Sequence, residues 1–140
     1  MTEKNYFRLN LVYFLMIKFM QSFAVLVMFL LPAVSFGQLT GIEAALQKGS
    51  ATELGTFFNK TVDLSIPGHE DSYPAGQAIS ILNEFFTTQA VKGYKRNHLS
   101  APQQGRASYS IGDLNTAQGT YRLTMYFDAA QKITEIRIQK

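Results

Sequence analysis

Few residues in this chain of 140 amino acids could do acid, base or metal chemistry. Its two histidines, His69 and His98, stand 29 positions apart and do not form a helical ligand pair of the His-Glu-x-x-His kind. The sequence holds no cysteine, which excludes thiolate nucleophiles, disulfides and zinc–thiolate sites. It also lacks the Gly-x-Ser-x-Gly turn of serine hydrolases and a glycine-rich phosphate loop. We therefore expect neither a metal nor another cofactor.

The charge of the chain does not point to nucleic acid. The formal net charge is +3, from 13 Lys and Arg residues against 10 Asp and Glu residues. The basic cluster at residues 92–96, Lys-Gly-Tyr-Lys-Arg, is typical of the solvated face of a strand. We expect no nucleic-acid partner.

The elements that must position any site begin with two short helices. Capping boxes, in which Ser or Thr is followed three residues later by Glu, mark helix starts at Thr40 and Ser50. Gly49 suits the left-handed end of the first helix. The pattern predicts helices within residues 39–49 and 50–59.

A strand and a longer helix follow. Alternation of apolar and polar residues over 61–66 predicts a half-buried strand, and Pro-Gly-His-Glu-Asp at 67–71 predicts a turn. Pro74 fits the first turn of a helix over residues 74–89. The apolar side chains of that helix recur on one side: Ala78, Ile81, Leu82, Phe85 and Phe86.

The rest of the chain predicts strands over residues 93–100, 107–115, 119–127 and 132–139. We expect a bulge at Gly112, because Tyr109 and Ile111 are in phase along the second of these strands whereas Leu114 is not. Helices gathered on one face of a curved antiparallel sheet make an α+β domain.

Five stretches in this order carry a resemblance: residues 35–38, 42–66, 73–86, His98, and 109–139. Together they resemble a family of small exported bacterial proteins, typical of Bacteroidetes, catalogued as domain of unknown function 4783. That family is similar to the nuclear transport factor 2-like cone. The resemblance implies two short helices, a strand, an amphipathic helix and a curved antiparallel sheet, and it specifies no reaction.

The cone resemblance implies one kind of enzyme. Related isomerases and cyclases hold a carboxylate base opposite a hydrogen-bond donor. Asp63 is the carboxylate in a comparable place, and the candidate donors are His98, Tyr73, Tyr109 and Tyr121. The first helix, where the isomerases offer a tyrosine, has only apolar residues on its buried side, namely Ile42, Ala45 and Leu46. An isomerase, cyclase or dehydratase is therefore the alternative hypothesis.

The first hypothesis is a small binding or interaction domain without catalysis. Such a domain would bind either a protein partner on the sheet or a small apolar ligand in a cavity of the cone, lined by Phe85, Phe86, Tyr109, Tyr121, Leu123 and Met125. The same side chains would otherwise form a closed core. A homodimer through the open face of the sheet is compatible with either arrangement.

An apolar segment precedes this domain. Lys18, the apolar residues 23–31, and the small residues Ser35 and Gly37 follow the order of a secretory signal. We expect residues 1–37 to be a signal peptide, with Met16 as an alternative start. Residues 38–140 then form one periplasmic or secreted domain, which meets the membrane only through that signal.

The first prediction concerns processing. Mass spectrometry of the exported protein should find Gln38 at or near the N-terminus, because a cut after Gly37 places small side chains at the positions that the peptidase reads. A mature form that keeps residues 19–36 would instead indicate a retained membrane helix.

Overall fold

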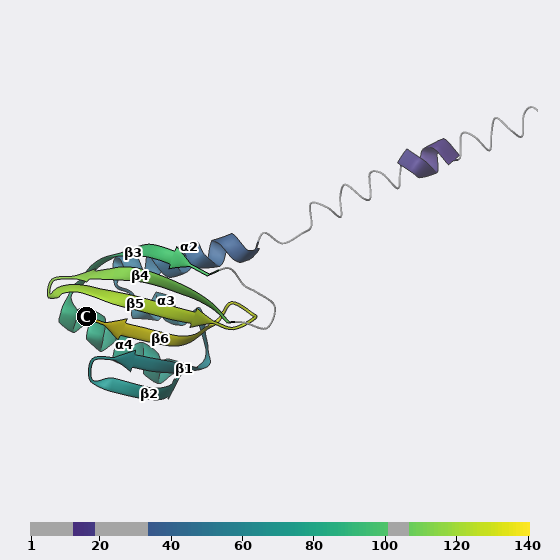
Figure 1. Cartoon of the computed structure of the whole chain (residues 1–140). Coiled ribbons are helices and arrows are strands. Elements are labelled where there is room, and N and C mark those ends of the chain that lie inside the picture. The colour runs from purple at the N-terminus through teal and green to yellow at the C-terminus, as the bar shows by residue number, and fades with distance from the viewer. Residues whose placement is uncertain (1–12, 19–33, 101–106) are drawn as a thin grey trace, which may run out of the picture. The chain divides into compact units, whose positions relative to one another are not determined.

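The structure, a computed structural model, describes residues 13–18, 34–100 and 107–140 (Figure 1). The chain divides into two compact units, Met1–Val34 and Ser35–Lys140. The first contains a short helix at residues 13–18. No helix in the described parts of the chain is long and apolar enough to cross a membrane. The apolar core of the expected signal, at 23–31, lies outside the described residues.

The remaining elements follow one another in a mixed order. They are α2 (Val34–Lys48), α3 (Ala51–Gly55), β1 (Phe58–Ile66), β2 (His69–Pro74), α4 (Ala75–Gln89), β3 (Val91–Leu99), β4 (Ser108–Thr116), β5 (Gly119–Phe127) and β6 (Ile133–Gln139). The expected α+β class is confirmed.

The strands form one sheet in the order β2-β1-β6-β5-β4-β3. Four of the five pairings are antiparallel, and β1 runs parallel to β6. The β1–β2 hairpin therefore joins the free edge of the meander that β3 to β6 build. The sheet is mixed, whereas the sequence predicted a wholly antiparallel one.

The hydrophobic core lies between the helices and one face of the sheet (Figure 1). The buried side of α4 consists of Ala78, Leu82, Phe85 and Phe86, and this helix packs on α3, β1 and β2. Inward side chains of the central strands complete the core, among them Leu114, Tyr121, Leu123, Met125, Ile136 and Ile138. The predicted covering of the sheet by the 74–89 helix is confirmed.

Of the two predicted helix caps, one is correct. The backbone N–H of Glu53 donates to Ser50 Oγ at 3.2 Å, while the Glu53 carboxylate pairs with Lys48. The predicted start at Thr40 is wrong, because α2 begins at Val34 and the Thr40 hydroxyl bonds back to the carbonyl of Gly37. Gly49 has the expected positive φ of 65°.

Strand β2 was not predicted. Its sequence, His-Glu-Asp-Ser-Tyr-Pro, shows no clear alternation of apolar and polar residues. An edge strand has only one neighbour and is commonly polar, and Pro74 removes a donor at its end. These features make a protected sheet edge look like a turn in the sequence.

The predicted bulge at Gly112 is also wrong. Strands β4 and β5 pair without interruption from Ser108 to Thr116. The inward residues of β4 are Ser108, Ser110, Gly112 and Leu114, and Tyr109 and Ile111 point outward. The irregularities lie instead in β3, between Val91 and Gly93 and, opposite Gly112 and Ile111, between Arg96 and His98.

Gly112 is required because an aromatic ring occupies the space beside it. A Cβ atom at this position would lie 2.5 Å from ring atoms of Tyr94. Tyr94 is only 4% exposed, and its hydroxyl lies 3.4 Å from Ser110 Oγ. Burial raises the pKa of Tyr94 above its ordinary value, so this hydroxyl stays neutral at physiological pH.

We predict that Gly112→Ala lowers the free energy of unfolding by about 1–3 kcal/mol, because the new methyl group overpacks the core against Tyr94. Gly76→Ala is the matched control, since no atom lies within 4 Å of a Cβ there. It should be neutral or raise the free energy of unfolding by up to about 1 kcal/mol, because α4 gains helix propensity. Urea unfolding measures both, and equal effects would contradict the close packing.

Candidate functional site

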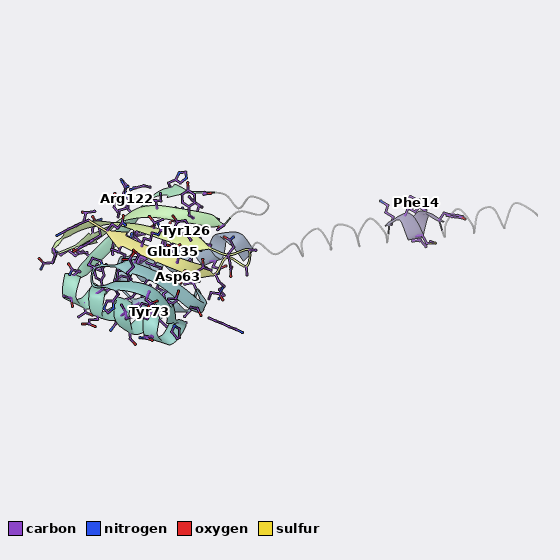
Figure 2. The ribbon with its side chains drawn as sticks, turned by 60° about the horizontal axis from the view of Figure 1, so that its bottom comes forward. Phe14, Asp63, Tyr73, Arg122, Tyr126 and Glu135 are labelled. Carbon is purple, nitrogen blue, oxygen red and sulfur yellow. The ribbon has the colours of Figure 1, made fainter. Side chains whose placement is uncertain are left out.

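The two faces of the sheet differ in what covers them. Inward residues pack beneath the helices, whereas α3 and α4 do not pack on the opposite side. We call that opposite side the open face. Figure 2 labels four of its residues, namely Asp63, Arg122, Tyr126 and Glu135.

Strand register aligns five side chains in one row across the open face. Ser72 pairs with Asp63, Asp63 with Glu135, Glu135 with Tyr126, and Tyr126 with Tyr109. Directly opposed residues have Cβ atoms about 4.5–5.5 Å apart. These side chains, which we call the open-face row, therefore form a continuous strip from β2 to β4.

The row is aromatic at its β4–β5 end. The ring centroids of Tyr109 and Tyr126 lie 6.0 Å apart, and that of His98 on β3 lies 5.6 Å from Tyr109. The guanidinium carbon of Arg137 lies 5.4 Å from the Tyr126 centroid. His98 is exposed and the two tyrosines are half-buried, so ring surface remains accessible to solvent.

The other end of the row is polar. Asp63 accepts a hydrogen bond from the hydroxyl of Ser72, and Glu135 accepts one from Arg137 Nε. The hydrogen bond to Glu135 raises the pKa of the Arg137 guanidinium, which stays fully charged. Arg137 thus contacts both the Glu135 carboxylate and the Tyr126 ring.

A groove of about 420 Å³ lies at this polar end. Its lining holds four carboxylates and one guanidinium: Asp63, Glu70, Asp71, Glu135 and Arg137. The remaining lining residues are Leu64, Ser65, Ser72 and Gln139. The groove has the volume of a ligand site, is open to solvent and carries an excess of negative charge.

Five of the six expected cavity residues gather under α4. Phe85, Phe86, Tyr121, Leu123 and Met125 all belong to the core, and the Phe85 and Tyr121 centroids lie 5.4 Å apart. The Tyr121 hydroxyl donates to Gln89 Oε1 at 2.9 Å. The sixth, Tyr109, lies on the open face because it pairs with the outward residue Tyr126.

A second, smaller hollow of about 170 Å³ lies beside α4, next to the β1–β2 turn. Its lining is Ile66, Pro67, His69, Ile81, Glu84, Phe85, Thr88 and Gln89. Phe85 belongs to both this hollow and the expected cavity, and Gln89 of the hollow bonds to Tyr121 of the cavity. This volume is below the usual range of drug-sized ligand sites.

The structure does not bring Asp63 together with its expected donors. Asp63 is exposed on β1, and its hydrogen-bond partner is Ser72. His98 lies at the far edge of the sheet, with three strands between β1 and β3. Tyr73 and Tyr121 pack from the helix-covered side. The described residues contain no group of three or more acidic or histidine side chains that could hold a metal ion.

Sequence reasoning missed Ser72, Glu135 and Arg137 as members of a site. Their outward phase on the strands is readable for Glu135 and Arg137 in the alternation of β6. The parallel pairing that sets Asp63 beside Glu135 joins residues 72 positions apart, and no local pattern carries that information.

Comparison with known protein families shows the family to which this chain belongs. Residues 39–139 match the family described as a domain of unknown function, DUF4783. The chain belongs to this family. A solved DUF4783 protein from Bacteroides fragilis YCH46 is 32% identical, with a TM-score of 0.64, and the match covers 71% of this chain and 95% of that one. No curated protein matches the sequence.

More distant structures share the fold of this DUF4783 chain. A nuclear transport factor 2-like protein of unknown function from Cytophaga hutchinsonii is 14% identical, with a TM-score of 0.50 over 71% of this chain and 83% of that one. A steroid delta-isomerase from Pseudomonas aeruginosa is 15% identical, with a TM-score of 0.55 over 79% and 81%. The expected nuclear transport factor 2-like fold is confirmed.

Two tyrosines on β5 test the assignment of the faces. Tyr121→Ala should lower the free energy of unfolding by about 3 kcal/mol or more, because this side chain is 6% exposed and fills the core. Tyr126→Ala should cost about 1 kcal/mol, since only its ring contacts on the open face are lost. Urea unfolding measures both, and equal losses would contradict the assignment.

Proposed function

We propose that this DUF4783 protein is an exported, non-catalytic binding domain whose binding surface is the open face of the sheet. The observation that carries the proposal is the open-face row, in which rings and charged groups stand side by side and α3 and α4 pack on the other face of the sheet. The groove of about 420 Å³ at the polar end of the row is large enough to hold a small ligand.

The interior favours this surface over an internal cavity. Phe86, Leu123 and Met125 are each at most 3% exposed, so the space under α4 is filled by side chains. In the described residues no buried side-chain N or O atom lacks a hydrogen-bond partner. Each of these buried polar atoms therefore already has a partner within the protein.

The chemistry of the open face suits recognition. Tyr and Arg suit recognition because Tyr joins a large flat ring to a hydroxyl group, and Arg carries five donors in a planar fork. Tyr126 and Arg137 already contact each other, so a ligand meets a partly ordered surface and loses less side-chain entropy on binding.

Catalysis of the isomerase type receives less support. The steroid delta-isomerase likeness is a likeness of fold, at 15% identity. In the isomerase arrangement, a carboxylate base would lie in an enclosed pocket opposite a hydrogen-bond donor. Asp63 is instead exposed and accepts a hydrogen bond from Ser72. Export, in turn, is supported by the pattern of residues 1–37.

The hollow of about 170 Å³ supports a second candidate, the binding of a small apolar ligand. Phe85 and Ile81 would give such a ligand apolar contact, and Gln89 a polar one. The hollow would admit a ligand of only a few heavy atoms, which is why we place it second.

A thermal-shift screen of the purified full chain tests the proposal. The library contains oligosaccharides, peptides, lipids and small metabolites. A ligand present at a hundred times its dissociation constant stabilises the fold by about 2.7 kcal/mol. We expect the stabilisation to disappear in Tyr126→Ala and to persist in Ile81→Ala, which alters the second hollow and leaves the open face unchanged.

The reverse pattern would contradict the proposal. Hits that survive Tyr126→Ala and vanish in Ile81→Ala would place binding in the second hollow, and a screen without hits would remove the support for a small ligand on either surface.

A further inference from the structure

We infer that the open face recognises a neutral oligosaccharide chain, an inference that rests on the proposed binding function. Three features of the surface carry it: a row of aromatic rings, a charged hydrogen-bonding groove continuous with those rings, and the length of the strip that they share. The length of the strip argues against a single sugar, and the charge of the groove argues against anionic glycans.

The mixture of groups matches the two surfaces of a sugar. A pyranose ring presents C–H groups on its faces and hydroxyls around its rim. The rings of Tyr109, Tyr126 and His98 offer flat surfaces on which C–H faces can pack. Carboxylates and a guanidinium form the stronger, charge-assisted hydrogen bonds that hydroxyl groups need. Asp63, Glu135 and Arg137 supply them in the groove.

The length of the row points to a chain of sugars. The row runs from Ser72 on β2 to Tyr109 on β4, across four strand spacings. Neighbouring strands lie about 4.8 Å apart, so the row extends over about 19 Å. A single sugar ring would cover only a fraction of that distance, whereas an extended oligosaccharide could contact the groove and the rings together.

The charge of the groove selects against anionic glycans. Four carboxylates face a single guanidinium, so a uronate or a sulfated sugar would be repelled. Neutral hydroxyl groups bring no charge of their own into this field. The ligand class that fits is therefore an oligosaccharide without acidic groups.

A protein partner fits the surface less well. Stable protein interfaces have an apolar centre surrounded by a polar rim. Among the outward residues of β4, β5 and β6, Ile111 is the only aliphatic side chain, and charged residues stand on both sides of the rings. A second copy of this chain would therefore bury mainly charged and hydroxyl groups.

Isothermal titration calorimetry of the purified full chain tests the inference. The probes are neutral oligomers of glucose, xylose, mannose and N-acetylglucosamine, with oligogalacturonate as the anionic comparison. We expect at least one neutral series to bind, with affinity that rises with chain length, and oligogalacturonate to bind at least about tenfold more weakly.

Variants locate the binding. Tyr126→Ala and Tyr109→Ala should each weaken binding about tenfold, whereas Tyr126→Phe, which keeps the ring, should stay close to the wild type. Asp63→Asn alters an exposed groove carboxylate without threatening the fold and should also weaken binding. Glu53→Gln, an exposed carboxylate on α3 that lines neither the groove nor the second hollow, is the matched control and should change nothing.

The outcomes separate this inference from the proposed function. If no neutral oligosaccharide binds but another ligand is lost in Tyr126→Ala, the sugar inference fails and the binding surface stands. If binding of every probe is insensitive to Tyr126→Ala, both fail. Sedimentation that shows a dimer disrupted by Tyr126→Ala or Arg137→Ala would assign the open face to a second copy and overturn the inference.

Discussion

Burial of the apolar side of α4 against the sheet is the contact on which the rest of the structure depends. Leu82, Phe85 and Phe86 meet the inward side chains of the strands, and without a disulfide the domain is held by this burial. Phe85 also touches Tyr121, whose hydroxyl bonds to Gln89 at the end of the same helix. The buried apolar area and the Tyr121–Gln89 hydrogen bond thus hold α4 over the strands. The inward side chains of the strands then belong to the hydrophobic core.

This use of the inner face leaves the outer face for the binding that we propose. Parallel pairing of β1 with β6 brings Asp63 beside Glu135, and antiparallel pairing then continues the row to Tyr126 and Tyr109. Successive side chains of a strand point to opposite faces of the sheet. A residue on the open face can therefore be replaced without changing the inward residues that stabilise the domain. The proposed binding surface therefore uses side chains that the core does not need.

The two edge strands of the sheet, β2 and β3, are protected against strand addition by another chain. The open face therefore remains as the surface for the binding that we propose. The β3 edge is partly covered by α2: Gln47 Nε2 donates to the carbonyl of Tyr94, and Arg96 Nε pairs with Glu43 at 3.1 Å. The β2 edge is short, polar and ended by proline. Edges built in this way discourage strand addition by another chain.

The sequence by itself determined the α+β class, the covering helix, the alternation of β1, β5 and β6, and the second helix cap, since each depends on residues a few positions apart. Register, faces and the sheet order were decided only in three dimensions. Gly112 illustrates the reason: its role depends on the ring of Tyr94, 18 positions away, and a local pattern misread it as a bulge. The open-face row likewise joins residues from five strands, because backbone pairing, rather than spacing along the chain, makes them neighbours.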